Sequence, residues 1–366
     1  MDGLARKAAR IDFSTVSGLR RDAAAREASP GHLWPVCRHH APPPVQHPSP
    51  IPVHYVQRDS PLGSGPCFPK PFFTNDGLLG EGSEGAAFRA SRRDTGRVCA
   101  LRKVANKVRY GLDQLGRVLF MNKFDVVHGE MMVLGRLQGL KKVLQLKGVY
   151  HMEGASFFEL EYLAEGSLYT RCGCPTAIYV DNYGRSAVSE SLAREWASQL
   201  ITANKGLIAR GVYHGDYHAN NIMFERADSQ DLKMIDFGNA LLFDPSQGNT
   251  TVRNKASIVG SLFIHAPETF VPHGVFDAEK AAVHAIGRLM RQLLCWGHEN
   301  ISDTSSYAPP VFGRRDLSPE CIALLTQMTE ADPTNCPTLD ECAKSSWFEP
   351  PAATRTRPAT KRKSCC

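Results

Sequence analysis

Three polar side chains at a fixed spacing carry the strongest chemical signal in this sequence. Asp216 and Asn221 lie in the segment YHGDYHANNIMF, and Asp236 follows 15 residues after Asn221 in the segment MIDFGNA. A carboxylate can accept the proton of an attacking hydroxyl group, while an amide oxygen and a second carboxylate are suitable Mg²⁺ ligands. Transfer of a nucleotide's terminal phosphate needs these groups together. The spacing therefore predicts phosphoryl transfer, with Asp216 as the base and Asn221 and Asp236 as metal ligands.

A glycine-rich segment supplies a second part of such a site. Gly80, Gly82 and Gly85 form the pattern GxGxxG after a strand-like start. The same spacing occurs in dinucleotide-binding folds, where the glycines open a helix. Here the strand-like residues AAFRA follow instead, which predicts a loop between two strands. Glycines in such a loop let backbone amides approach phosphate oxygens without a Cβ in the way.

The elements that must position these residues fall into two regions. Residues 71–163 contain short apolar runs typical of strands, together with one segment of helical spacing, HGEMMVLGRLQGL. Helical patterns follow over residues 190–210 and 277–296. We expect an α+β fold with two lobes, a small β-rich N-terminal lobe over residues 71–163 and a larger, mainly helical lobe over residues 164–348.

The two ends of the chain differ in composition from its centre. Residues 1–70 hold 11 of the 24 prolines, which predicts a disordered arm because proline removes backbone donors and favours extended chain. A transit peptide is the alternative for residues 1–28, although their four acidic side chains argue against it. Residues 349–366 form a basic tail that ends in KRKSCC. We expect an unmodified tail, and the alternative is lipidation, because this ending resembles the geranylgeranylated ends of small GTPases.

The net charge of +6 is concentrated in the same two ends. Residues 1–70 and 349–366 each contribute +4, which leaves −2 for residues 71–348 and gives no support to a nucleic-acid-binding face there. No apolar run reaches the roughly 18 residues of a spanning helix. We therefore expect a cytoplasmic protein, with weak or lipid-mediated membrane contact through the tail as a further possibility. The 11 irregularly spaced cysteines indicate reduced thiols, and the CxC of Cys172 and Cys174 lacks recognisable partners for a metal site.

Taken in order along the chain, these motifs resemble the eukaryotic protein kinase domain of the serine/threonine type. The resemblance covers about residues 78–348. The catalytic loop of that family begins His-Arg-Asp, and this chain has HGD at 214–216 with Asn221 five residues after the acid. GSLFIHAPE resembles the end of an activation segment, with Ser261 where serine/threonine kinases have a threonine. The resemblance implies ATP and Mg²⁺ as cofactors and a protein as the acceptor.

The resemblance also implies which residues contact the nucleotide. Leu79 and Ala87 would border the adenine and Ala100 would line it, while Glu161 and Leu163 belong to the hinge whose backbone meets the base. The implied nucleotide-binding residues are Leu79, Gly80, Gly82, Gly85, Ala87, Ala100, Arg102, Lys103, Glu130, Glu161 and Leu163.

The chain departs from the family at the residue that clamps the phosphates. Arg102, two residues after Ala100 and seventeen after Gly85, stands where the family has lysine. Arginine keeps the charge and could pair with Glu130, but its planar fork is not equivalent to a compact ammonium group. Side chains alternate along a strand, so Lys103 would point away from the phosphates. A one-residue bulge that returns Lys103 to the site is the alternative.

Further departures bear on activity. Gly215 replaces an arginine that receives an activation-loop phosphate in many kinases. His218, which we expect among the catalytic residues, replaces a lysine near the transferring phosphate. Ala282 replaces a buried aspartate behind the catalytic loop, and Cys336 replaces an arginine that would pair with Glu268.

These departures motivate two alternatives to an active protein kinase. The first is an inactive pseudokinase that scaffolds partners. The second is a small-molecule kinase, since loops of that class also follow the pattern HGDxHxxN. The segment GSLFIHAPE argues against the second alternative, because small-molecule kinases lack it.

Overall fold

The computed structural model describes most of the chain between residues 51 and 349. The described residues are 51–56, 68–82, 85–105, 109–112, 118–121, 123–152, 154–172, 188–226, 228–254, 264–295 and 316–349. All of them belong to one structural unit, residues 44–366. Residues 1–28, for which a transit peptide is the alternative, lie outside the described residues, as do Ser261 and the basic tail after Glu349.

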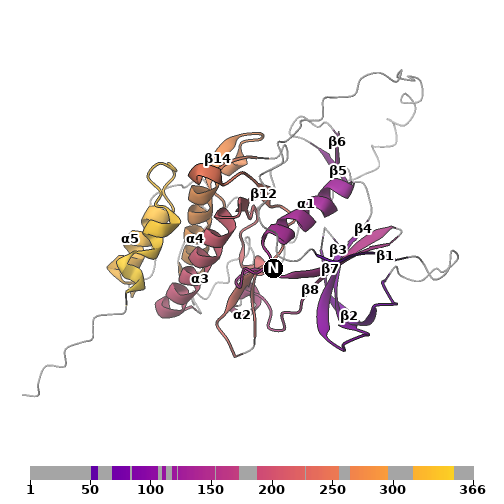
Figure 1. The fold of residues 1–366 in the computed structure, drawn as a ribbon. Coiled ribbons are helices and arrows are strands. Elements are labelled where there is room, and N and C mark those ends of the chain that lie inside the picture. The colour runs from indigo at the N-terminus through magenta and orange to yellow at the C-terminus, as the bar shows by residue number, and fades with distance from the viewer. Residues whose placement is uncertain are drawn as a thin grey trace, which may run out of the picture. The chain divides into compact units, whose positions relative to one another are not determined.

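Six strands form the N-terminal sheet in the order β1-β7-β8-β4-β3-β2 (Figure 1). They are β1 (Val53–Tyr55), β2 (Phe73–Gly82), β3 (Gly85–Arg92), β4 (Val98–Ala105), β7 (Leu146–Met152) and β8 (Ala155–Glu161). Neighbouring strands are antiparallel except for the parallel pair β1 and β7. A separate hairpin pairs β5 (Arg109–Leu112) with β6 (Val118–Met121).

The two faces of this sheet pack into different cores, as alternation along a strand requires. Leu101 and Phe157 belong to a cluster on one face. Phe158 and Leu160 belong to the main core, together with Leu134 of helix α1 (Lys123–Arg136). The helix is therefore held against the sheet by its apolar residues.

Strand β1 lies within residues 1–70, so the expectation of a disordered arm is wrong for this segment. The backbone N–H of Val149 donates to the carbonyl of Pro52 at 2.9 Å, and that of Val56 donates to the carbonyl of His151 at 2.8 Å. The His54 ring stacks on Tyr150 at a centroid distance of 4.7 Å. Proline dominates the composition of the arm, but this short segment has free N–H groups and apolar side chains that can extend a sheet.

Helices dominate the C-terminal part, and α3 and α4 pack side by side (Figure 1). The helices are α2 (Leu168–Cys172), α3 (Glu190–Ile208), α4 (Ala278–Cys295), α5 (Pro319–Met328) and α6 (Leu339–Ala343). Short 3-10 turns lie at Ala219–Asn221, Ser246–Gly248, Pro267–Phe270 and Ser346–Phe348. The side chain of Ser189 caps α3 by accepting from the N–H of Leu192 at 3.3 Å. Helix α4 is buried around most of its circumference.

The described C-terminal residues contain three short strand pairs, two of which position the polar loops. The strands are β9 (Val212–Tyr213), β10 (Ile222–Phe224), β11 (Leu232–Met234), β12 (Leu241–Leu242), β13 (Thr251–Arg253) and β14 (Val275–Asp277). The loop with Asp216 runs from β9 to β10, and the loop with Asp236 runs from β11 to β12. Because β9 pairs with β12 and β10 pairs with β11, the two loops are held next to each other.

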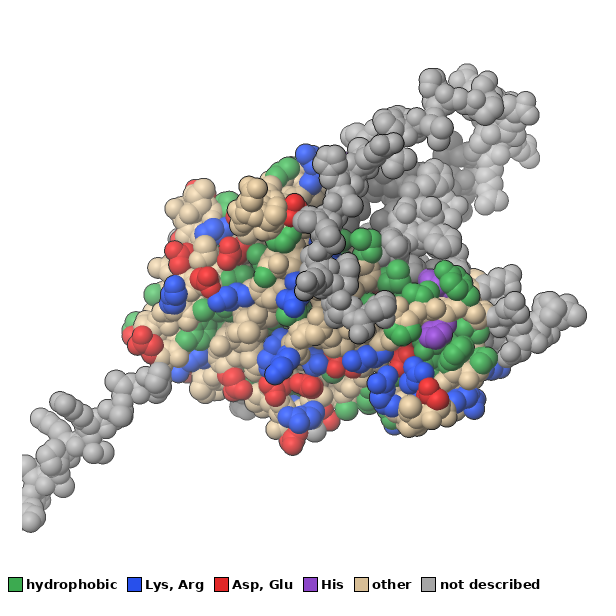
Figure 2. Space-filling model, in the orientation of Figure 1, with side chains coloured by type: hydrophobic (Ala, Val, Ile, Leu, Met, Phe, Trp, Pro, Cys, Tyr) green, Lys and Arg blue, Asp and Glu red, His purple; other side chains and the backbone are tan. Residues whose placement is uncertain are grey.

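The surface is mixed in charge on the face that Figure 2 shows. Lysine and arginine side chains are interspersed there with aspartate and glutamate, and apolar and histidine side chains are exposed beside the N-terminal sheet. Within the described part of the chain, none of the helices has the length and apolar character needed to cross a lipid bilayer.

Candidate active site

A cavity of about 570 Å³ is lined by the N-terminal sheet, helix α1 and the loop that follows β11. Its size and mainly apolar lining suit a ligand of nucleotide dimensions. Ten of the residues predicted to bind nucleotide or metal line it, namely Leu79, Gly80, Gly85, Ala87, Ala100, Arg102, Glu130, Glu161, Leu163 and Asp236. Five other predicted residues are not among the lining residues, namely Gly82, Lys103, Asp216, His218 and Asn221.

The strand register shows which of the two basic side chains, Arg102 or Lys103, faces the cavity. Arg102 lies opposite Ala87 of β3 and Phe158 of β8, and the register runs without interruption through both pairings. The alternative of a bulge that brings Lys103 to the cavity is therefore wrong. Arg102 lines the cavity, and the sequence count that selected it agrees with the pairing.

The Arg102 guanidinium contacts two carboxylates at once. Its Nη1 pairs with Oε1 of Glu130, which α1 supplies from a side chain that is only 4% exposed. Its Nη2 lies 3.3 Å from Oδ1 of Asp236. The fork therefore joins the sheet, helix α1 and the loop after β11.

His214 ties the two polar loops together. The Nε2–H of this buried imidazole donates to the carbonyl of Ile235 at 2.9 Å, and Nδ1 accepts from the backbone N–H of Asp216 at 3.2 Å. One nitrogen that donates and one that accepts define a neutral ring. Burial lowers the pKa of His214, which agrees with this neutral form.

The carboxylate of Asp216 is oriented by two neighbours. Nδ2 of Asn239 donates to its Oδ2 at 3.2 Å, and Nε2 of His218 lies 3.6 Å from the same oxygen. Burial raises the pKa of Asp216, but the hydrogen bond and charge of His218 outweigh that effect and leave the pKa below its ordinary value. The group is therefore ionised at neutral pH, as a proton acceptor must be.

Asn221 and Asp236 present oxygen atoms that fit a hard divalent cation. Nδ2 of Asn221 donates to the backbone carbonyl of Asp216 at 3.0 Å, which leaves its amide oxygen as an acceptor. The backbone N–H of Ile235 donates to the carbonyl of Asn221 at 2.9 Å, so the two loops meet at this point. Asp236 has a φ of 60°, a left-handed conformation rare outside glycine and often found at functional sites.

The candidate metal site at Asn221 and Asp236 has few protein ligands. Among the described residues, no group of three or more His, Cys, Asp or Glu side chains is arranged to hold a metal ion. One amide and one carboxylate nevertheless suit Mg²⁺, which keeps several waters and takes further oxygens from substrate phosphates.

Asn239 and Gly215 form a close contact that the sequence patterns do not indicate. Gly215 has a φ of +77°, and a Cβ built there would lie 2.4 Å from the carbonyl oxygen of Asn239. No side chain fits this backbone, so the arginine that many kinases have at position 215 is incompatible with it. The only signal in the sequence is the amide residue directly after the DFG tripeptide.

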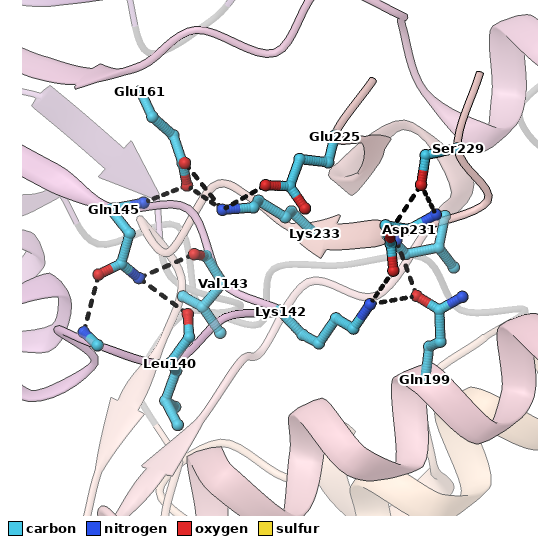
Figure 3. Close-up of polar contacts among 12 residues, drawn as sticks. Leu140, Lys142, Val143, Gln145, Glu161, Gln199, Glu225, Ser229, Asp231 and Lys233 are labelled. Atoms are coloured by element: carbon cyan, nitrogen blue, oxygen red, sulfur yellow. Dashed lines mark hydrogen bonds and ion pairs between the residues drawn. The ribbon is translucent and has the colours of Figure 1, made fainter. Parts of the chain in front are cut away.

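A second polar network joins the predicted hinge to the loop-bearing strands (Figure 3). Nζ of Lys233, on the buried strand β11, donates to both carboxylate oxygens of Glu161 at 2.8 Å. The backbone N–H of Gln145 donates to Oε1 of Glu161 at 2.8 Å. Nearby, Nζ of Lys142 pairs with Asp231 at 2.6 Å. The Lys233–Glu161 pair holds the end of β8 against β11, and Lys233 lies three residues before Asp236.

The remaining departures from the family pattern leave apolar or weakly polar contacts. Ala282 is fully buried in α4. Cys336 is buried, and its thiol donates to the carbonyl of Met328 at 3.6 Å. Glu268 makes no ion pair among the described residues, and burial raises its pKa.

Comparison with known proteins identifies the class that this fold and site define. Residues 73–348 match the family described as "Protein kinase domain", and the chain belongs to that family. The α+β fold with an N-terminal sheet and a helical C-terminal part is the fold of this family, so the predicted family and fold class are confirmed.

Individual relatives are distant. The chain is 26% identical over 283 residues to "CBL-interacting protein kinase 30" of Oryza sativa subsp. japonica. The matched residues cover 74% of this chain and 53% of that protein. The chain is 25% identical over 280 residues to "CBL-interacting serine/threonine-protein kinase 20" of Arabidopsis thaliana, with 74% and 57% covered. It is 25% identical over 224 residues to "Serine/threonine-protein kinase PKH1" of Saccharomyces cerevisiae, with 59% and 26% covered. The chain spans about half the length of the first of these relatives.

Proposed function

We propose that this chain is an ATP- and Mg²⁺-dependent protein kinase that transfers the γ-phosphate to serine or threonine of a protein. The observation that carries the proposal is the hydrogen-bonded meeting of two loops, one with Asp216 and Asn221 and the other with Asp236, beside a cavity of about 570 Å³. The names of the distant relatives, two of which include "serine/threonine-protein kinase", support the choice of acceptor.

Each residue has a proposed task in the reaction. The backbone of the glycine-rich segment would cover the phosphates, and the backbone from Glu161 to Leu163 would contact the adenine. Oδ1 of Asp216 would orient the acceptor hydroxyl group and take its proton while Asn239 and His218 hold the other carboxylate oxygen. Asn221 and Asp236 would hold Mg²⁺, which neutralises charge on the phosphates when bound.

Phosphate transfer to a generic protein acceptor tests this function. We expect the full chain to move radioactive phosphate from γ-labelled ATP to serine or threonine, identified by phosphoamino-acid analysis. Asp216→Asn should lower the rate by about 100-fold or more, because the amide cannot accept the proton. Asp244→Asn, the same change at an exposed site away from the cavity, should leave the rate unchanged. Transfer that survives Asp216→Asn at the wild-type rate would reject this mechanism.

A catalytically inactive scaffold is the second candidate. Arg102, Ala282 and Cys336 favour it, because each replaces a side chain that braces the family's catalytic site. A folded protein with no transfer, and no gain of transfer in Arg102→Lys, would support the scaffold over the enzyme.

A further inference from the structure

Arg102 contacts two of the acidic side chains that line the cavity, Glu130 and Asp236. Its side chain is 15% exposed, and those of Glu130 and Asp236 are 4% and 37% exposed. The guanidinium thus sits in a partly dehydrated place with one carboxylate on either side. A planar fork suits this position, because its two terminal nitrogens can each serve a different carboxylate.

Arg102 cannot easily leave this position. Strand β4 is paired on both sides, with β3 and with β8, and the register fixes the direction of the side chain. Glu130 is nearly buried, and breaking a buried ion pair by removing one partner destabilises the folded protein. The contact with Glu130 therefore holds the fork within reach of Asp236.

The contact matters because it uses one of the two carboxylate oxygens of Asp236, a predicted metal ligand. Oδ1 of Asp236 accepts from the backbone N–H of Gly238 at 3.3 Å and also faces Nη2 of Arg102 at 3.3 Å. A divalent cation that approached this oxygen would meet the positive guanidinium. A lysine ammonium, which is a single compact charge, cannot serve Glu130 and Asp236 with separate nitrogens in the same way.

We propose that the Arg102 guanidinium takes the place of Mg²⁺ beside the carboxylate of Asp236. Because arginine and metal compete for this carboxylate, ATP binding is largely independent of Mg²⁺. This inference rests on the proposed function, since it assumes that ATP enters the cavity. It concerns the metal requirement of ATP binding alone and makes Arg102 the residue that sets it. In the transfer step Mg²⁺ would displace Nη2 of Arg102 from Asp236, while Nη1 stays on Glu130. Arginine supplies positive charge at the place where the nucleotide phosphates would lie, and Asp236 holds the fork in that place.

Nucleotide binding with and without metal tests the proposal. The dissociation constant of ATP is measured by isothermal titration calorimetry on the full chain, once with excess EDTA and once with excess Mg²⁺. For the wild type we expect binding in EDTA and a change of less than about threefold on adding Mg²⁺. For Arg102→Lys we expect Mg²⁺ to tighten binding by about tenfold or more, because Asp236 is released to the metal.

Two further variants keep the result interpretable. Arg93→Lys makes the same substitution at an exposed arginine outside the cavity and should behave as the wild type. Arg102→Met removes the charge altogether and should weaken ATP binding in EDTA by about tenfold, with partial recovery in Mg²⁺. Thermal unfolding shows whether Arg102→Met folds. If it does not fold, the comparison of the wild type with Arg102→Lys is the test.

The outcomes separate this inference from the proposed function. ATP binding that needs Mg²⁺ equally in the wild type and in Arg102→Lys would overturn the role of Arg102 and leave the kinase proposal standing. Failure of the folded wild type and of Arg102→Lys to bind ATP under either condition would overturn the proposed function together with the inference that rests on it.

Discussion

Gly215 occupies a backbone position in the loop with Asp216 that a residue with a Cβ cannot take without a shift. Two separate features require glycine there, a φ of +77° and the carbonyl oxygen of Asn239 at 2.4 Å from the position of a Cβ. The same tight contact places the amide of Asn239 against Asp216. An arginine side chain at this position would require the backbone near Asn239 to shift.

We predict that Gly215→Ala destabilises the protein more than a matched glycine does. Gly248 has a similar φ of +73°, but nothing lies within 4 Å of its Cβ position. Gly248→Ala should cost about 1 to 2 kcal/mol for the left-handed backbone alone. Gly215→Ala should cost at least about 1 kcal/mol more because of the steric clash. Urea unfolding measures both, and equal losses would contradict the contact.

The sequence predicts site residues when their spacing is local and misses them when a tertiary contact defines them. Asp216, Asn221 and Asp236 stand at intervals that point to their chemistry without any fold. Asn239 and Lys233 have no such spacing, because their roles depend on which strands pair. Their partners lie 23 and 72 residues away in the sequence.

At the scale of elements, strand β1 extends the N-terminal sheet, and Ile51, just before it, reaches helix α1. The Cδ1 atom of Ile51 would lie 3.6 Å from a Cβ at Gly135 of that helix, and Ile51 packs against the main core. Because the same helix carries Glu130, the segment before β1 helps to hold the partner of Arg102.

We predict that Ile51→Ala lowers the free energy of unfolding by about 1 to 2 kcal/mol. This loss is smaller than for the same substitution at a fully buried isoleucine, because Ile51 is half-buried. Val53→Ala also removes methyl groups from this segment, but Val53 is 41% exposed and the change should cost less than about 0.5 kcal/mol. Urea unfolding of both variants checks the prediction. A loss at position 51 no larger than that at 53 would mean that the segment does not brace the helix.

The ion pair between β8 and β11 gives a second prediction for elements. Lys233→Met leaves the half-buried carboxylate of Glu161 without its main partner and should cost about 1 to 3 kcal/mol. Adding Glu161→Gln to Lys233→Met should lower the free energy of unfolding little further, because the unpaired charge is then absent. A double-mutant cycle by urea unfolding measures the coupling. Additive losses would show that the pair does not join the two strands.

The elements that the sequence predicts well are those with a clear period. The helix expected over residues 190–210 is observed at Glu190–Ile208, and the one expected over 277–296 is observed at Ala278–Cys295. Strand β1 is missed because prolines surround it and only pairing with β7 makes it a strand. A three-residue strand carries too little pattern to outweigh such a composition.

For the whole molecule, buried histidines set a dependence of stability on pH. Burial lowers the pKa of His265 and of His284 from 6.5 to about 4, and it also lowers that of His214. The unfolded chain binds protons at these groups near pH 6.5, whereas the folded chain binds them only at lower pH. Stability is therefore complete above pH 6.5 and falls as the pH drops toward the folded values. The raised pKa of Glu268 makes stability fall as the pH rises, which is the opposite dependence, but this is one group compared with three histidines.

We predict that the free energy of unfolding falls by about 2 to 5 kcal/mol between pH 7 and pH 5, since each group contributes up to about 1.4 kcal/mol per pH unit. His265→Gln should reduce this fall by about 1 to 2 kcal/mol, because glutamine does not titrate and its amide oxygen can still accept from the N–H of Tyr217. Urea unfolding at the two pH values measures both. A fall of the same size in His265→Gln would contradict burial of a neutral ring at this position.

The central claim is that the cavity beneath the glycine-rich segment binds ATP, and calorimetric titration of ATP into the full chain with Mg²⁺ tests it most directly. Ala100 lines the cavity, so Ala100→Phe should fill it, whereas Val275→Phe adds the same ring at a site that is 55% exposed and outside the cavity. We predict one ATP per chain for the wild type and for Val275→Phe, and an affinity weakened by about tenfold or more for Ala100→Phe. Unchanged affinity in a folded Ala100→Phe protein, or no binding by the wild type, would contradict the account.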